Sequence, residues 1–328
     1  MLPTIPDLRQ LRYFVTVAEE KHFGRAAARL SMTQPPLSQA IRALEETLGV
    51  ELFARTKRSV ELTAVGADLL PEVQRLLAAA EGLRPLAQSL ARGEAGVLSL
   101  AFVSTADYGL LPLLLRDFGA RHPRVRLELT EATSDVQVEE LVAGRIDAGL
   151  VIAPLPSRHA ARLSWLPIAR EPLVIAMSSE MAQGLGGSVN KNGNGDTFED
   201  PAAEWLDTPV SLRDLAEAPL VIFPRRLAPG FYDIIMDCYG VAGLAPRIGQ
   251  EAIQMQTIVS LVSAGMGVAL VPQSLRNLRR TGVVYRPLSE SVPAIETGLV
   301  WRTDEVSPVL AGFIDIVRAH AASVASRV

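Results

Sequence analysis

Two short amphipathic helices joined by a three-residue turn are predicted over residues 23–48, and this segment restricts the fold more than any other. Thr33 is a candidate N-cap for the second helix. Pro35 and Pro36 fall in its first turn, where a missing N–H costs nothing because those donors have no intrahelical partner. Leucines and isoleucine then follow at spacings of four, three and four, which predicts one buried stripe: Leu37, Ile41, Leu44 and Leu48.

The opposite face of this second helix is polar. Glutamine can pair bidentately with adenine and arginine with guanine, so a short helix opening in this way is typical of a helix-turn-helix that enters the major groove of DNA. The alternative is an ordinary helix with a solvated face. The residues predicted to touch DNA from this helix are Gln34, Pro35, Pro36, Ser38, Gln39 and Arg42.

Residues 53–63 contain two short extended runs that predict a β-wing. Its cations, Arg55, Lys57 and Arg58, are expected to contact the phosphate backbone and so position the protein without reading sequence. Residues 21–60 carry seven Lys or Arg against three Glu, whereas the whole chain has a formal net charge of −4. The positive charge is therefore local, as expected for a nucleic-acid footprint.

A long helix is predicted from about Ala64 to Arg92, with apolar residues at alternating spacings of four and three. Such a narrow stripe favours pairing with a second copy, and a two-fold dimer would present two recognition helices to an inverted-repeat site. Packing on its own chain is the alternative. Pro71 and Pro85 interrupt the pattern, so we expect a kink or frayed turn near each, with Pro85 ending the regular helix early. The predicted dimerisation residues are Leu69, Val73, Leu76, Ala80, Leu83 and Leu90.

The pattern of residues 11–73 resembles the N-terminal region of LysR-type transcriptional regulators, and the resemblance continues more loosely to the C-terminus. It implies an α/β protein with an all-α-rich N-terminal winged helix-turn-helix and a C-terminal two-lobed effector domain like a periplasmic binding protein. It also implies a linker-helix dimer, assembly into tetramers and a cytoplasmic location. The corresponding domains are residues 1–63, the linker 64–92 and the effector-binding domain 93–328.

From Val97 onward, strands alternate with helices, which predicts a mostly parallel sheet covered on both faces. The chain is expected to leave a first lobe near Leu166 and to re-enter it near Val271, giving lobe I over about 93–166 and 271–305 and lobe II over about 167–270. Ligands of open α/β sheets bind at the carboxyl ends of strands, close to helix N-termini.

The predicted effector contacts lie at three such junctions: Ser104, Thr105, Thr133, Ser134, Pro224 and Arg225. The hydroxyl residues could equally be simple helix caps, and the arginine could equally be solvated. Hydroxyls and helix N-termini suit a carboxylate, so we expect a small effector that is anionic or aromatic.

Composition and motifs exclude several other functions. No nucleophile-elbow, P-loop or paired-carboxylate motif appears, so we expect no enzymatic activity.

Cys238 is the only cysteine, which rules out a two-cysteine redox switch. The four histidines lack metal-ligand spacing, so no metal or cofactor is expected. The sequence has no N-terminal apolar segment and no apolar run of about twenty residues, so we expect neither secretion nor a membrane span. Residues 182–208, rich in Gly, Asn and Asp, are expected to form a mobile loop. The competing function is a solute-sensing module that acts through protein partners.

Overall fold

The structure, a computed structural model, describes residues 5–55, 60–155, 157–185, 204–205, 207–305 and 307–325. The chain forms two compact units, Met1–Ser89 and Leu90–Val328. Most of the predicted linker helix thus belongs to the first unit. Within the described ranges, no helix combines the length and apolar character needed to cross a membrane.

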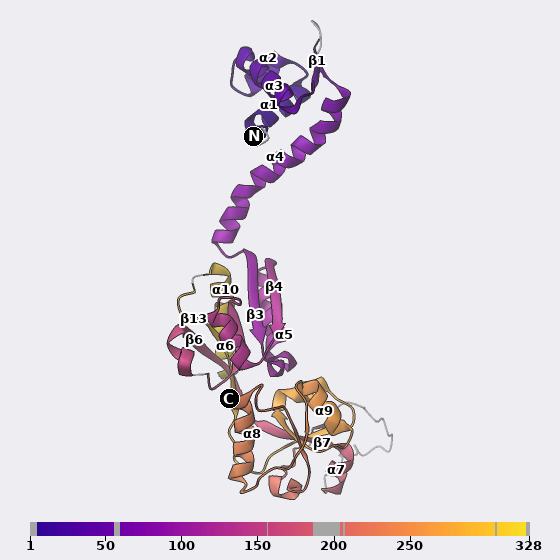
Figure 1. The fold of residues 1–328 in the computed structure, drawn as a ribbon, viewed down its shortest axis with the longest axis vertical. Helices are drawn as coiled ribbons and strands as arrows, with labels where there is room; N and C mark the ends of the chain where they lie inside the picture. The colour runs from indigo at the N-terminus through magenta and orange to yellow at the C-terminus, as the bar shows by residue number, and fades with distance from the viewer. Residues whose placement is uncertain are drawn as a thin grey trace. The chain divides into compact units, whose positions relative to one another are not determined.

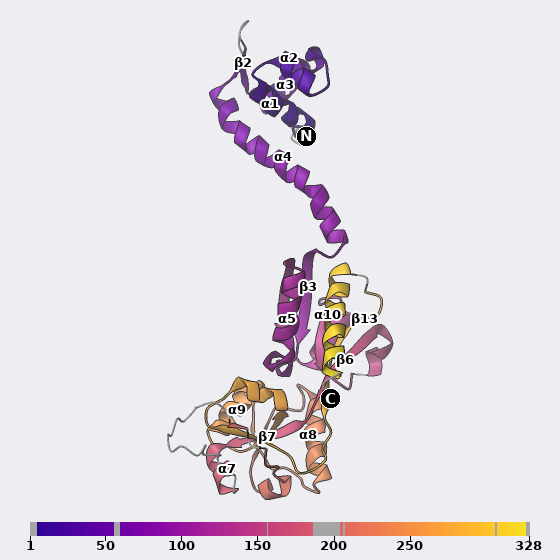
Figure 2. The ribbon, with the colours of Figure 1, turned by 180° about the vertical axis from the view of Figure 1, so that it is seen from behind.

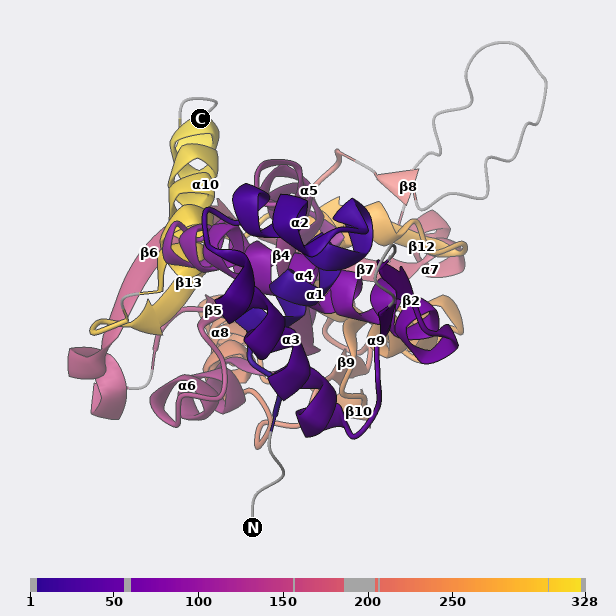
Figure 3. The ribbon, with the colours of Figure 1, turned by 90° about the horizontal axis from the view of Figure 1, so that it is seen from above.

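The first unit is a three-helix cluster followed by a two-stranded wing and a long helix (Figures 1 and 3). Its elements are α1 (Leu8–Glu20), α2 (Phe23–Arg29), α3 (Gln34–Leu48), β1 (Phe53–Arg55), β2 (Val60–Leu62) and α4 (Ala64–Ala91). β1 and β2 pair antiparallel. Phe53 of β1 packs edge-on against Phe14 and Phe23, with ring centroids 5.5 and 6.0 Å apart, so the wing shares the helical core.

The three helices of this unit are capped in different ways. Asp7 forms a capping box with Gln10 at the start of α1. Thr33 occupies the N-cap position of α3 but makes no side-chain cap bond. His22, which the sequence did not mark as a cap, accepts N–H bonds at its Nδ1 from Gly24 (3.0 Å) and Arg25 (3.3 Å) and so begins α2.

The expectation that Pro85 ends the long helix early is wrong, because α4 continues through both Pro71 and Pro85 to Ala91. If Leu69 and Leu76 are assigned to position d of a heptad, both prolines occupy position f, on the side opposite the apolar stripe. Both prolines are exposed. The carbonyl groups that lose their bonds can therefore be hydrated while the helix continues on either side.

The second unit begins with a five-stranded sheet in the order β4-β3-β5-β13-β6, in which β3 runs parallel to β4 and β5 while β13 runs antiparallel to β5 and β6 (Figure 1). Helices α5 and α10 pack together, with α10 against β3 and β6, while α6 packs against β3, β5 and β13. The elements of this first lobe are β3 (Ala95–Phe102), η1 (Ser104–Tyr108), α5 (Leu110–Arg121), β4 (Arg124–Glu131), α6 (Ser134–Val142), β5 (Ala148–Ile152), η2 (Ser157–Arg162), β6 (Leu163–Glu171), β13 (Ile295–Arg302) and α10 (Pro308–Ala325).

The second lobe contains a four-stranded sheet, β11-β7-β12-β8, and a parallel pair, β10-β9. Its elements are β7 (Leu173–Ser178), α7 (Ser179–Gly184), β8 (Glu204–Trp205), η3 (Leu212–Leu215), β9 (Leu220–Ile222), α8 (Pro229–Val241), β10 (Ile248–Glu251), α9 (Met255–Ser263), β11 (Ala269–Pro272), η4 (Gln273–Leu278) and β12 (Val283–Pro287). Figure 2 labels β7 of this sheet together with the helices α7, α8 and α9 of the lobe.

The sheet memberships correct the predicted lobe boundaries. β11 and β12 pair antiparallel with β7 and thus belong to the second lobe. The predicted re-entry into the first lobe near Val271 is therefore wrong. The chain crosses between lobes at Pro172, between β6 and β7, and again between β12 and β13. Much of the predicted loop at 182–208 lies outside the described residues; the end of α7 and the short strand β8 fall within it.

Candidate functional site

The amino-terminal half of α3 presents an unengaged polar surface. The stripe residues Leu37, Ile41 and Leu44 are fully buried, which forces the opposite face outward. Ser38 is half-buried, and the other predicted contacts on α3 are exposed: Gln34, Pro35, Pro36, Gln39 and Arg42. Among the described residues, the side chains of Gln39 and Arg42 have no hydrogen-bond or ion-pair partner, so both are available to an external ligand.

The positive charge of this unit is smaller than the count over residues 21–60 suggested. Arg29 bonds both Glu19 (2.7 Å) and Glu20 (3.2 Å), which lie just outside that window, and Arg25 also pairs with Glu20. Hydrogen bonds to these glutamates raise the pKa of Arg29. These ion pairs join α2 to α1 and partly offset the charge of both arginines, which stay more than half exposed.

The wing is positioned from α3 by a contact that sequence reasoning missed. The Glu45 Oε1 accepts the N–H groups of Leu52 (3.0 Å) and Phe53 (3.2 Å), which fixes the start of β1. Arg55 ends β1, while Lys57 and Arg58 lie outside the described residues. The only sequence signal for this role was an acidic residue at the end of a helix that precedes a short strand.

The predicted apolar stripe of α4 divides into two parts. Leu69 and Val73 pack on the core of the first unit, where Val73 is buried, and Ala80 is half-buried. Leu76 and Leu83 remain 51% and 62% exposed. Leu90 and Leu86, the latter at position g, are also exposed. Within the described residues, Leu76, Leu83 and Leu90 thus remain largely uncovered, unlike Leu69 and Val73.

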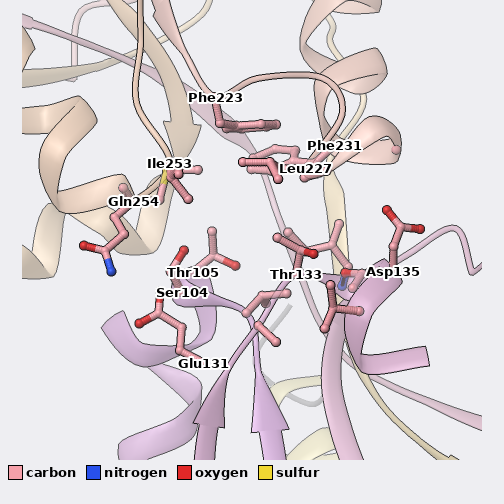
Figure 4. Close-up of a pocket in the computed structure, with 18 of the residues that line it drawn as sticks. Ser104, Thr105, Glu131, Thr133, Asp135, Phe223, Leu227, Phe231, Ile253 and Gln254 are labelled. Carbon is pink, nitrogen blue, oxygen red and sulfur yellow. Dashed lines mark hydrogen bonds between the residues drawn. The ribbon is translucent and has the colours of Figure 1, made fainter. Parts of the chain in front are cut away.

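A cavity of about 470 Å³ opens between the two lobes of the second unit (Figure 4). From the first lobe it is lined by residues that follow β3, β4 and β5, and from the second lobe by residues that follow β9 and β10. These are carboxyl ends of strands, where open α/β sheets bind ligands. The volume lies within the range of sites for small organic molecules.

Four predicted residues come together in this cavity: Ser104, Thr105, Thr133 and Ser134. Thr105 is 5% exposed, and its Oγ1 has no hydrogen-bond partner among the described residues. Ser134 Oγ accepts the N–H of Ile152 (3.1 Å), so it ties α6 to the end of β5. Thr133 is the N-cap of α6 but makes no side-chain cap bond. The hydroxyls of Thr105 and Thr133 are therefore uncommitted.

Pro224 and Arg225, predicted as effector contacts, do not line this cavity. Pro224 is buried, and Arg225 forms a two-bond ion pair with Asp233 of α8 (2.8 and 2.9 Å). The residues beside them in sequence line it instead: Phe223, Leu227, Ala228, Gly230 and Phe231. The turn after β9 that the sequence singled out does line the cavity, but through side chains other than the two predicted.

Sequence reasoning also missed the charges and the support of the site. Glu131 and Asp135 line the cavity, and none of its described lining residues is Lys, Arg or His. Gln137 is fully buried and donates from Nε2 to the carbonyl of Ala132 (2.7 Å), which holds the turn between β4 and α6. Tyr108, next to the site on η1, has its pKa raised to about 12 by burial and by nearby Asp107 and Glu131.

Comparison with known proteins identifies both units. The description "Bacterial regulatory helix-turn-helix protein, lysR family" matches residues 8–67, and "LysR substrate binding domain" matches residues 91–322. The chain belongs to the LysR family. This LysR-type chain is accordingly a DNA-binding transcriptional regulator with an effector-binding domain, as the sequence analysis predicted, and the family is not an enzymatic one.

Relatives match the LysR-type chain over nearly its whole length. It is 49% identical to the HTH-type transcriptional regulator IlvR of Caulobacter vibrioides (95% of this chain, 97% of IlvR) and 38% identical to AlsR of Bacillus subtilis (94% and 95%). Among solved structures, full-length CbnR in complex with its target DNA superposes with a TM-score of 0.71 at 31% identity, covering 96% of this chain and 99% of CbnR. The predicted fold class is thereby confirmed.

Proposed function

We propose that this LysR-type regulator binds an inverted-repeat DNA site as a dimer, reading bases with the start of α3 and sensing a small molecule in the cavity between its lobes. The observation that carries this proposal is the exposed, unpaired polar face at the start of α3, held outward by the buried leucine stripe. A regulator that binds DNA must share a compartment with the chromosome, so we place this protein in the cytoplasm.

Base reading is assigned to Gln34, Pro35, Pro36, Ser38, Gln39 and Arg42. CbnR, the similar protein solved with its target DNA, supports the use of this unit for DNA binding. We assign phosphate contacts to Arg55, Lys57 and Arg58 of the wing. The exposed leucines of α4 are assigned the dimer contact, and the family resemblance supports further assembly into tetramers.

The effector is assigned to the cavity lined by Thr105 and Thr133. An ordered hydroxyl that is buried without a partner costs free energy, which a ligand hydrogen bond would recover. Because both lobes line the cavity, a ligand bound there favours one lobe arrangement over another and can alter how the paired DNA-binding units meet their site.

DNA binding is tested by gel shift or fluorescence anisotropy with the region upstream of the chain's own gene. Arg42→Ala should weaken specific binding by about 1–3 kcal/mol, because a bidentate base contact is lost, and should change binding to random DNA little. Glu46→Ala, an exposed site on the same helix, is the matched control.

Equal losses on specific and random DNA would remove Arg42 from the base-reading set. The competing function, a solute sensor acting only through protein partners, predicts no DNA binding even at low salt. In that outcome the exposed face of α3 would be an ordinary solvated surface, and the proposed function would be wrong.

A further inference from the structure

We infer that the effector is a free α-amino acid with an apolar side chain, recognised through both its carboxylate and its ammonium group. This inference rests on the proposed effector function of the cavity and names the ligand class. Three features of the lining carry it: an uncapped helix start with an unpartnered hydroxyl, two carboxylates without any cation, and an apolar wall.

The carboxylate of the ligand is matched by the start of α6 and by Thr105. Because Thr133 makes no side-chain cap bond, the first-turn N–H groups of α6 remain open to an acceptor. The helix dipole adds a favourable potential for an anion at this end. Thr105, buried and without a hydrogen-bond partner for its hydroxyl, is directed to the same side of the cavity (Figure 4).

The ammonium group of the ligand is matched by Glu131. Figure 4 shows this carboxylate beside Ser104 and Thr105, whereas Asp135 lies on the far side of Thr133. Among the described residues, Glu131 has no hydrogen bond or salt bridge, and Arg225 is already paired with Asp233. The lining therefore carries two negative side chains without a positive one.

This charge pattern discriminates between ligand classes. The first turn of α6 carries Asp135, and Glu131 lines the same cavity. A monocarboxylate at the start of α6 would therefore meet two negative side chains without compensation, and a dicarboxylate would add a further repulsion. An ammonium group on the ligand offsets this negative charge by pairing with Glu131, while the carboxylate binds at the start of α6. The sequence predicted an anionic or aromatic effector. The charge of the cavity favours a zwitterionic effector, in which an ammonium group balances the carboxylate.

The remaining wall accepts an apolar side chain. On the opposite side of the cavity Phe223, Leu227 and Phe231 lie together (Figure 4). Ile253, between β10 and α9, is 64% exposed, and Val136 is 49% exposed. A branched aliphatic or aromatic side chain seated here would cover these groups and gain their burial.

The experiment measures binding to the full-length protein by calorimetry and thermal shift, with pairs of ligands that differ only in the amino group. L-Leucine is compared with 4-methylpentanoate, L-phenylalanine with 3-phenylpropanoate, and both with the dicarboxylate muconate. We expect at least one amino acid to bind about tenfold or more tightly than its deaminated partner and than muconate.

Variants assign the discrimination to its residues. Glu131→Gln should remove most of the preference for the amino acid while leaving the deaminated acid bound as well as before or better. Thr105→Val should weaken both ligands of a pair. Glu180→Gln, an exposed carboxylate of α7 outside the cavity, should change neither.

The inference is overturned if the deaminated acid or muconate binds as tightly as the amino acid. If Thr105→Val then weakens that ligand, the cavity remains the effector site and only the ligand class is wrong. If no compound of the panel binds, the amino-acid class is likewise overturned, while the gel shift with Arg42→Ala tests the regulator function independently.

Discussion

Glu171 shows how one side chain braces a crossing between the lobes. It ends β6, and its carboxylate accepts the N–H (2.8 Å) and hydroxyl (3.2 Å) of Ser274 at the start of η4. Burial raises the pKa of Glu171, and the two bonds from Ser274 offset that rise only in part. In the folded state, burial therefore disfavours the ionised form of Glu171 relative to its neutral form.

This raised pKa predicts the pH dependence of stability. An acid whose pKa is higher in the folded than in the unfolded state contributes stability below its unfolded pKa, and this contribution is lost as pH rises through the folded pKa. We therefore expect the wild type to lose stability relative to Glu171→Gln as pH rises above the ordinary glutamate pKa of about 4 and through the raised pKa of the folded state. Urea unfolding followed by tryptophan fluorescence measures the difference; a gap independent of pH would contradict it.

Individual side chains also mark where sequence reasoning reached its limit at the cavity. Ser104, Thr105 and Thr133 could be predicted because residues that follow a strand and begin a helix occupy the carboxyl edge of a sheet. Arg225 was misassigned because its true partner, Asp233, lies eight residues away in α8 and nothing in the local pattern reveals that pairing. Glu131 was missed because a lone acid at a strand end carries no motif.

Among the secondary-structure elements, those with strong local signals were predicted well. The buried stripe and the twin prolines set the limits of α3 near those predicted. β6 was missed because Pro167 and several half-buried residues break its alternation, and a register shift lies where it pairs with β13. β11 and β12 were placed in the wrong lobe because a strand's sequence does not state which strand it pairs with.

The exposed stripe of α4 gives a prediction about assembly. Leu83 occupies position d and is 62% exposed, and burying such a leucine contributes about 1.5–3 kcal/mol per chain. Leu83→Asp should therefore weaken the dimer strongly, as sedimentation velocity over a concentration series would show. Ala78→Asp, exposed at position f of the same helix, is the matched control and should leave the dimer intact. Equal behaviour of the two variants would assign the dimer contact elsewhere.

From the charge of the complete chain, we expect DNA binding to depend on having two copies. The net charge of −4 opposes approach to DNA, and pairing of Arg25 and Arg29 with α1 glutamates leaves few cations for phosphate on each first unit. Binding should thus draw on both subunits of a dimer, and each neutralised phosphate releases counterions. Affinity must then fall steeply with salt, with a slope set by the number of phosphates contacted.

That slope links assembly to DNA binding in one measurement. If each subunit contacts an equal share of phosphates, the slope of log affinity against log salt should fall to about half when Leu83→Asp separates the subunits. Lys57→Ala, which removes one predicted phosphate contact per subunit, should instead reduce the slope by about two for the dimer and weaken specific and random DNA alike. Anisotropy titrations at several salt concentrations with the wild type and both variants provide the comparison. An unchanged slope in Leu83→Asp would mean that a single subunit makes all the phosphate contacts, so the paired arrangement of recognition helices would have to be abandoned.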